Sequence, residues 1–198
     1  MPQAVLIVVD MLNDFFDQSD VLRAQRNRLV ASINSLASEL RSLGSQVFWV
    51  RQEFAPDLSD AFPEMRRRNV SITIAGTPGA DLLADLDRSP EDVTIVKKRY
   101  SAFYNTELEE RLARAQPDIV IVAGVNTHAC VRTTVIDAYQ RDYNTIVAEE
   151  CVASNDPEHG EITARYLNDK VAPFMSNAAI IDVLRTNRDS SPEDRQRK

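Results

Sequence analysis

The sequence predicts an α/β fold, with a three-layer α/β/α arrangement around a six-stranded, mostly parallel sheet. Residues 4–9 form a continuous apolar run, as in a strand that is buried on both faces of a parallel sheet. Apolar residues from 29 to 43 recur at spacings of four, three, four and three, which places them on one face of a helix. Strand-like and helix-like segments alternate along the chain, and this order favours parallel strands joined by crossover helices.

The expected elements follow one another in a regular order. Strands are expected at residues 4–9, 46–51, 92–96, 118–124, 145–148 and 178–183. Helices are expected at residues 21–43, 80–86, 106–115, 128–143 and 158–171. Gly44 directly follows the first helix, where glycine commonly ends a helix because it tolerates the left-handed conformation.

Two stretches lack this pattern. Residues 52–78 show no clear periodicity and contain Pro56, Pro63, Gly76 and Pro78, so we expect a long loop with short helical pieces. Loops of this length in a compact domain are usually functional. Residues 186–198 contain no apolar side chain, and we expect them to form a disordered polar tail. Residues 1–185 are then expected to form a single domain, which fits a chain of 198 residues.

The composition excludes several classes of partner and compartment. The formal net charge of −7 should repel phosphate backbones and anionic lipids, so we expect neither nucleic acid nor a membrane as partner. The expected partner is a small-molecule substrate. Two cysteines provide no disulfide framework, which is typical of a reducing compartment. The apolar runs are strand-sized, and the N-terminus lacks the features of a signal peptide. We therefore expect a cytoplasmic protein.

Three kinds of reactive side chain lie at the carboxyl ends of predicted strands, where ligands bind in open α/β sheets. Asp10 follows the first strand, Lys97 and Lys98 follow the third, and Cys130 follows the fourth after a short loop. Adjacent lysines in a strand point to opposite faces, so only one of them can face a cleft. The alternatives are an acid that caps a turn and a solvated lysine pair at a strand end.

Cys130 is the candidate nucleophile of this group. With Thr127 as the N-cap, Cys130 falls in the first turn of a helix, where the backbone N–H groups and the helix dipole should lower the pKa of its thiol. The same N–H groups can hold an oxyanion when a carbonyl is attacked. The alternative is that Cys130 is a small buried apolar residue of the helix, which is the role we expect for Cys151.

Metal and cofactor chemistry find no support in the sequence. The chain has two histidines, His128 and His159, and no Asp-x-His pattern accompanies them. A zinc site requires more ligands than this. We expect no bound metal and no cofactor.

Three segments resemble motifs of a known family. They are LIVVDMLNDFF at residues 6–16, VKKRYSAFYNTEL at residues 96–108 and VAGVNTHACVRTTVIDAYQRDY at residues 122–143. They resemble the isochorismatase-like cysteine hydrolase family, which includes nicotinamidases, carbamoyl-amide hydrolases and ureidoacrylate hydrolases. The resemblance extends over about residues 4–183 and implies an isochorismatase-like fold with a Rossmann-like sheet.

The resemblance also implies roles for individual residues. Asp10 corresponds to the general base and Cys130 to the nucleophile, and Lys97 is the catalytic lysine because it lies four residues before Ser101. The family often has a cis peptide in the loop before the cysteine, which would fall at Val125–Asn126. Members are commonly oligomeric, so we expect a homo-oligomer, either a dimer or a tetramer. The stretch 51–68 lacks the Asp-x-His…His pattern of metal-binding nicotinamidases, which argues against a nicotinamidase and against zinc.

These observations leave three hypotheses. The leading one is a cysteine amidohydrolase that cleaves a small non-peptide amide or carbamoyl compound, with the amide N–H groups of Ala129 and Cys130 holding the oxyanion. The second is a vinyl-ether hydrolase, in which Asp10 and Lys97 act and Cys130 is a bystander. Its dicarboxylate substrate would need additional cations, for which the candidates are Arg51, Arg99 and Arg132. The third is a non-catalytic binding protein on the same fold. The candidate substrate-binding residues are Asn13, Phe16, Tyr104, Asn126 and His128.

Overall fold

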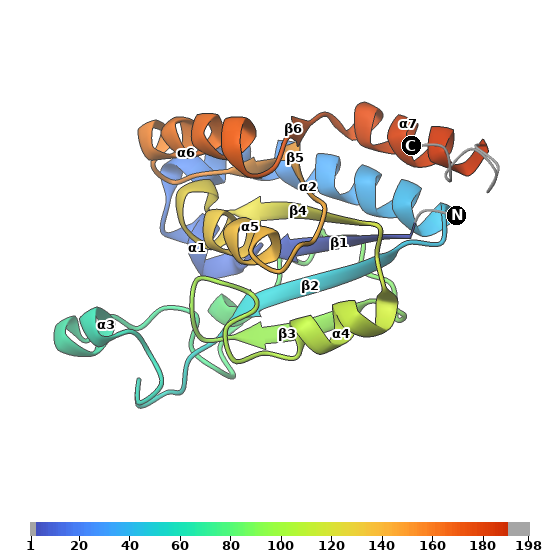
Figure 1. Ribbon diagram of the computed structural model, residues 1–198. Coiled ribbons are helices and arrows are strands. Elements are labelled where there is room, and N and C mark those ends of the chain that lie inside the picture. The colour runs from blue at the N-terminus through green and yellow to red at the C-terminus, as the bar shows by residue number, and fades with distance from the viewer. Residues whose placement is uncertain (1–2, 190–198) are drawn as a thin grey trace.

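The computed structural model describes residues 3–189 and contains a six-stranded parallel sheet in the order β3-β2-β1-β4-β5-β6 (Figure 1). The strands are β1 Ala4–Val9, β2 Gln46–Gln52, β3 Val93–Lys97, β4 Ile119–Val125, β5 Thr145–Ala153 and β6 Phe174–Met175. The parallel sheet predicted from the sequence is confirmed, and its first four strands end within one residue of their predicted bounds.

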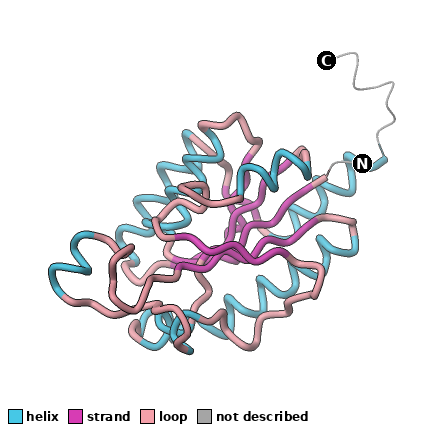
Figure 2. Tube along the Cα trace, turned by 90° about the horizontal axis from the view of Figure 1, so that it is seen from below, coloured by secondary structure: helices cyan, strands magenta, loops and turns pink. Residues whose placement is uncertain are grey.

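Helices cover both faces of the sheet (Figure 2). They are α1 Asn13–Asp17, α2 Asp20–Ser42, α3 Pro63–Arg68, α4 Leu108–Ala115, α5 Arg132–Tyr139, α6 Pro157–Lys170 and α7 Asn177–Asp189. One apolar cluster joins α2 and α7 to one face of the sheet, and a second joins α4, α5 and α6 to the other. The three-layer architecture is therefore confirmed, with a separate core on each side of the sheet.

The central strands β1 and β4 approach each other closely at Gly124. Gly124 pairs with Val9 in the parallel register and has a φ of +109°, in the region that favours glycine. A Cβ atom built at this position would lie 2.0 Å from the backbone oxygen of Val9. The glycine therefore permits the strand contact that brings the ends of β1 and β4 side by side.

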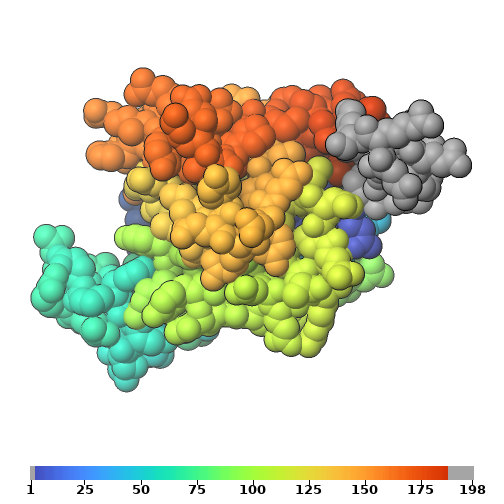
Figure 3. All heavy atoms as spheres, in the orientation of Figure 1, coloured from blue at the N-terminus to red at the C-terminus, as the bar shows by residue number. Residues whose placement is uncertain are grey.

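The loop over residues 52–78 is confirmed as long and irregular, with a single short helix, α3. It has a small apolar cluster of its own, in which Phe54, Leu58 and Ala61 are buried. An isolated bridge between Phe54 and Ile74 ties its two ends together. The tip of this loop, with α3, projects from the body of the protein (Figures 1 and 3).

Two predicted elements are wrong. Residues 80–86 are not a helix: one 3-10 turn at Pro78–Ala80 is followed by irregular backbone, in which Leu82 bridges Leu12 and the Leu83 amide donates to the Met11 carbonyl at 2.9 Å. Residues 178–183 are not a strand, since they belong to α7, and the sixth strand is the short β6 that precedes this helix.

The C-terminal region differs in part from its prediction. Helix α7 continues to Asp189, so it includes the beginning of the segment that we expect to be a disordered tail. Residues 190–198 lie outside the described residues. From residue 3 to residue 189, the chain contains no helix that combines the length and the apolar character needed to cross a membrane.

The glycine contact between β1 and β4 generates a first prediction. Gly124→Ala should lower the free energy of unfolding by more than about 4 kcal/mol or prevent folding, because its methyl group meets strand backbone rather than a movable side chain. Gly44→Ala is the matched control: its φ is +81°, but no atom lies within 4 Å of the added Cβ. We expect the control to cost about 1 kcal/mol. Denaturant unfolding measures both, and equal costs would contradict the close-approach argument.

Candidate active site

Asp10 stands at the carboxyl end of β1 in a constrained conformation. Its φ is +58°, which non-glycine residues adopt uncommonly and which often marks functional sites. The side chain is fully buried, and its Oδ1 accepts a hydrogen bond of 2.8 Å from the amide N–H of Gln52. The amide of Asp10 donates to the carbonyl of Val50 at 2.8 Å. The neighbouring strand β2 therefore fixes both the backbone and the carboxylate of Asp10.

Lys97 lies at the end of β3, and its ammonium group is at the centre of the site. The side chain is fully buried, and its Nζ lies 2.7 Å from Oδ2 of Asp10. Nζ also donates to Gln52 Oε1 at 3.2 Å, to the Arg99 carbonyl at 3.1 Å and to Cys130 Sγ at 3.4 Å. The structure therefore brings together the three residues that the sequence predicted as catalytic, in a cluster closed to solvent.

Cys130 lies in one turn of π-helix, Thr127–Val131, which precedes α5. Such turns occur frequently at functional sites. Asn126, rather than the expected Thr127, is the N-cap residue of this turn, and its side chain makes no capping hydrogen bond. The peptide bond Val125–Asn126 is cis, as the family resemblance implied. The Cys130 side chain is almost completely buried, with 4% of the residue exposed.

The protonation of the cluster differs from the sequence-based prediction. Burial raises the pKa of the Cys130 thiol well above its ordinary value, and the ammonium of Lys97 only partly opposes this effect. The expectation that the helix N-terminus lowers the pKa of this thiol is therefore wrong. Burial by itself would lower the pKa of Lys97, but the charge of Asp10 and then Cys130 raise it. The raised pKa of Cys130 favours the protonated thiol beside the contact between Lys97 and Asp10.

The two predicted oxyanion donors are the backbone amides of Ala129 and Cys130. The amide of Ala129 donates to the carbonyl of Asn126 at 3.0 Å, and the amide of Val131 donates to the same oxygen at 3.2 Å. Ala129 is therefore engaged within the turn, and an oxyanion can use its N–H only by sharing or replacing this bond. The oxyanion role of the Cys130 amide stays a prediction.

His128 and Asn126 connect the cysteine turn to the end of β5. The His128 ring nitrogen Nδ1 lies 2.5 Å from the hydroxyl of Ser154, and Asn126 Oδ1 accepts a bond of 2.8 Å from the amide of Asn155. Burial lowers the pKa of His128, and Asp156 opposes this effect. Both predicted substrate-binding residues thus hold the turn in place, and any contact with substrate stays a prediction.

The other predicted substrate-binding residues lie apart from one another. Phe16 is buried in the apolar cluster on the α2 side of the sheet, whereas Cys130 belongs to the cluster on the opposite side, so Phe16 is a core residue. Asn13 donates to the carbonyl of Pro78 at 2.8 Å and lines a cavity that does not include the thiol. Tyr104 is 56% exposed at a second cavity.

The cations that a dicarboxylate substrate would need are not gathered at one place. Arg51 contacts Glu53 at 2.7 Å, on the face of β2 opposite to the Gln52 side chain. Arg99 donates to the carbonyl of Asp60 at 2.8 Å. Arg132 stacks over the ring of Tyr166, 5.8 Å from its centroid. This separation weakens the vinyl-ether hypothesis.

Lys98 points away from the cluster and pairs with Asp60 at 3.0 Å, as expected for the second member of an adjacent pair. Within residues 3–189, no group of three or more histidine, cysteine, aspartate or glutamate side chains is placed to hold a metal ion. The cluster of Asp10, Lys97 and Cys130 contains one carboxylate, one ammonium and one thiol. This donor set suits proton transfer and nucleophilic attack.

Comparison with known proteins identifies the family of the chain. Residues 4–179 match the isochorismatase domain family. The chain belongs to the isochorismatase family. Membership of this family, together with a relative that is named as an amidohydrolase, indicates that the protein is a hydrolase.

Three relatives illustrate the range of the family. The chain is 35% identical over 162 residues to an Arabidopsis thaliana protein named probable inactive nicotinamidase, covering 77% of this chain and 82% of that protein. It is 29% identical over 175 residues to the ureidoacrylate amidohydrolase RutB of Methylorubrum extorquens, covering 77% and 71%. The crystal structure of an isochorismatase family protein from Desulfovibrio vulgaris matches with a TM-score of 0.82 and 27% identity, covering 93% of this chain and 99% of that one.

Gln52 is the residue of this isochorismatase-family site that sequence reasoning missed. Its amide donates to Asp10 and its side-chain oxygen accepts from Lys97, so one residue positions both members of the ion pair. A glutamine at the end of an apolar strand carries no signal by itself. The register of β2 with β3, which sets Gln52 opposite Lys97, is what reveals it.

We predict that Gln52→Leu lowers the free energy of unfolding by about 1–3 kcal/mol, because it removes an acceptor from a buried charged donor. Gln46→Leu is the matched control, since Gln46 is an exposed glutamine at the start of the same strand. We expect the control to change stability by less than about 0.5 kcal/mol. Denaturant unfolding compares the two variants. Equal effects would show that Gln52 does not support the ammonium of Lys97.

The raised pKa of the thiol gives a further prediction, measured in a Cys151→Ala background that leaves Cys130 as the single thiol. Iodoacetamide should alkylate native Cys130 more slowly at pH 7 than the same protein in denaturant. The native rate should continue to rise with pH beyond about 8.5, where an ordinary cysteine begins to level off. A native rate at pH 7 above the denatured rate would contradict a neutral resting thiol.

Proposed function

We propose that this hydrolase is a cysteine amidohydrolase, which cleaves the C–N bond of a small non-peptide amide or carbamoyl compound through a thioester. The observation that carries the proposal is the buried ammonium of Lys97, 2.7 Å from the carboxylate of Asp10 and 3.4 Å from the sulfur of Cys130. A thiol next to a carboxylate has a base at hand, and a nucleophilic thiol suits attack on a carbonyl carbon. The name of the relative RutB, a ureidoacrylate amidohydrolase, supports the same chemistry.

In the first half of the proposed reaction, Cys130 attacks the substrate carbonyl while Asp10 takes the thiol proton. The C–S bond forms, the carbonyl π electrons move to oxygen, and the ammonium of Lys97 and the Cys130 amide stabilise the negative charge. The intermediate then collapses with cleavage of the C–N bond. Asp10 returns the proton to the departing nitrogen, so that ammonia or an amine leaves and a thioester remains.

In the second half, water replaces the amine. Asp10, again a carboxylate, takes a proton from the water as its oxygen attacks the thioester carbonyl. Cleavage of the C–S bond releases the acid, and the proton held by Asp10 restores the thiol of Cys130. The protein begins and ends the cycle with the same protonation, and no external cofactor takes part.

The proposed place for the body of the substrate is a cavity of about 500 Å³ whose lining does not include the thiol but does include Arg99 and Thr133, two residues hydrogen-bonded to Lys97 and Cys130. Thr133 lines the cavity, and its hydroxyl donates to the carbonyl of Cys130 at 3.2 Å. Arg99 also lines the cavity, and its backbone carbonyl accepts a hydrogen bond from Lys97. Tyr104 lies in the same wall. The aromatic and alkyl side chains that line the cavity favour an amide that carries an apolar or planar group over a bare urea.

Ammonia release from a panel of small primary amides, ureas and carbamoyl compounds tests the proposal. We expect turnover by the wild type, loss of turnover by about a thousandfold or more in Cys130→Ala, and little change in Cys151→Ala. Cys151 is the matched control because it is also a buried cysteine, and its thiol donates to Asn177 Oδ1 at 3.3 Å in the apolar cluster on the other side of the sheet from Lys97. Far-UV circular dichroism verifies that both variants are folded.

Hydroxylamine adds a direct test of the intermediate, since it intercepts a thioester as a hydroxamate. Hydroxamate formation that depends on Cys130 supports the mechanism. Turnover retained in Cys130→Ala would overturn it. Cleavage of a vinyl ether by both the wild type and Cys130→Ala, with no ammonia from any amide, would favour the second hypothesis.

A further inference from the structure

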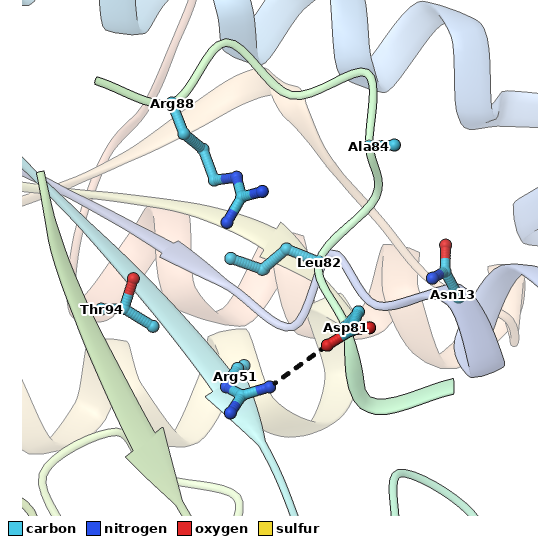
Figure 4. Close-up of a pocket in the computed structure, with 7 residues that line it drawn as sticks. All are labelled: Asn13, Arg51, Asp81, Leu82, Ala84, Arg88 and Thr94. Atoms are coloured by element: carbon cyan, nitrogen blue, oxygen red, sulfur yellow. Dashed lines mark ion pairs between the residues drawn. The ribbon is translucent and has the colours of Figure 1, made fainter. Parts of the chain in front are cut away.

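Two histidines and an aspartate lie beside the cysteine turn. His128 belongs to this turn, and the centroid of its ring is 6.1 Å from that of His159 on α6. Asp156, the N-cap residue of α6, contacts Nδ1 of His159 at 2.7 Å. In the cavity drawn in Figure 4, by contrast, Arg51 and Asp81 offset each other's charge at a distance of 3.6 Å. A histidine changes its charge within the physiological pH range, so the group beside the nucleophile can respond to pH.

The hydroxyl of Ser154 determines which nitrogen of His128 carries the proton. Ser154 Oγ accepts a hydrogen bond of 3.1 Å from the amide of Asp156 and lies 2.5 Å from Nδ1 of His128. The hydroxyl proton is left to donate to Nδ1, which is then an acceptor, and the ring proton is assigned to Nε2. The contact therefore favours the neutral imidazole. Burial acts in the same direction and lowers the pKa of His128.

A protonated His128 does not fit this contact. The imidazolium has a proton on each nitrogen, so Nδ1 becomes a second donor to Ser154 Oγ and the hydroxyl proton loses its acceptor. Ser154 is 6% exposed, and Gly160 of α6 packs closely against it, since a Cβ atom built at Gly160 would lie 2.9 Å from the Cβ of Ser154. A buried hydroxyl that loses its acceptor is unfavourable, so protonation of the ring weakens the contact.

The charged groups around His128 act in opposite directions. Asp156 favours the imidazolium, and His159 opposes it. Arg132, one helical turn after His128, stacks over the ring of Tyr166 on α6, 5.8 Å from its centroid. These groups adjust the pH at which the ring changes charge, and the hydroxyl contact decides what this change does to the turn.

The contact bears on the nucleophile because His128 and Cys130 belong to the same five-residue turn. The position of this turn sets the distance of 3.4 Å between Cys130 Sγ and Lys97 Nζ. We propose that His128 is a positioning residue: its neutral ring, held by Ser154, keeps Cys130 against Lys97, and its protonation loosens the turn. This role rests on the proposed function, in which Cys130 is the nucleophile, and adds that acidic pH disengages it.

Proton NMR can follow each ring separately, because the chain has two histidines. The His128→Asn variant identifies the His128 signal by its loss. Ser154→Ala removes a donor to the neutral ring, so the proton affinity of His128 should rise at least about threefold. An unchanged titration midpoint would overturn the proposal, because Ser154 would then not hold the neutral ring.

The reactivity of the thiol shows whether protonation loosens the turn. Methyl methanethiosulfonate is applied in the Cys151→Ala background, and the rate for the native protein is divided by the rate in denaturant at the same pH. Cys130 is mostly protonated in both states between about pH 4.5 and pH 7.5, so the ratio reports opening of the turn rather than the thiolate fraction. With His128 present, the ratio should rise at least about threefold as the pH falls through the His128 midpoint.

Two asparagine variants localise the effect. His128→Asn places Oδ1 near the position of Nδ1, where it accepts from Ser154 but takes up no proton, so its ratio should stay constant with pH. His159→Asn is the matched control, since His159 is the exposed histidine of the same group, and it should retain the rise. A constant ratio with both histidines present, or an equal rise in His128→Asn, would overturn the proposal. Circular dichroism verifies at each pH that the protein is folded.

These measurements do not use turnover, so the two proposals fail separately. Turnover retained in Cys130→Ala overturns the amidohydrolase mechanism but leaves the link between His128 and the turn intact. A constant ratio, with turnover lost in Cys130→Ala, overturns the link alone.

Discussion

The ion pair between Asp10 and Lys97 is the interaction on which the site and the sheet edge depend, because both side chains are fully buried. Removing two charges from water is expensive, and breaking a buried pair typically costs about 3–5 kcal/mol. The cost is offset only if the remaining donors and acceptors are satisfied. Gln52 does this for both partners, and Arg99 supplies a carbonyl to Lys97. Three parallel strands must therefore end in register before the pair can form.

The strands were predictable from the sequence because burial on both faces leaves continuous apolar runs. The error at residues 178–183 arose because short apolar runs do not distinguish helix from strand, whereas the error at residues 80–86 arose from tertiary contacts. The apolar residues of 178–183 pack as a helix, because Ile180, Ile181 and Leu184 lie on one face of α7. Leu82, Leu83 and Leu86 have the same spacing as the apolar residues of α7. Tertiary contacts with the segment after Asp10 nevertheless hold their backbone in an irregular conformation.

The site was predictable to the extent that its residues stand in motifs. Asp10, Lys97 and Cys130 come together as the resemblance implied, and strand ends alone already brought them to one edge. Phe16 was misplaced because it follows the strand that delivers Asp10, yet its helix turns it into the opposite core. Gln52 had no local signal, since its function comes from a register that only the folded sheet defines.

Burial also explains why the pKa of the Cys130 thiol is raised and not lowered as the sequence predicted. One ammonium already neutralises Asp10, so a thiolate at Cys130 would add a second negative charge to a cluster closed to solvent. In the proposed reaction the proton moves from Cys130 to Asp10 as the substrate carbonyl accepts the charge. The total charge of the cluster then stays constant, and Lys97 transfers its interaction from the carboxylate to the developing oxyanion. Nucleophile activation is thereby coupled to the presence of substrate.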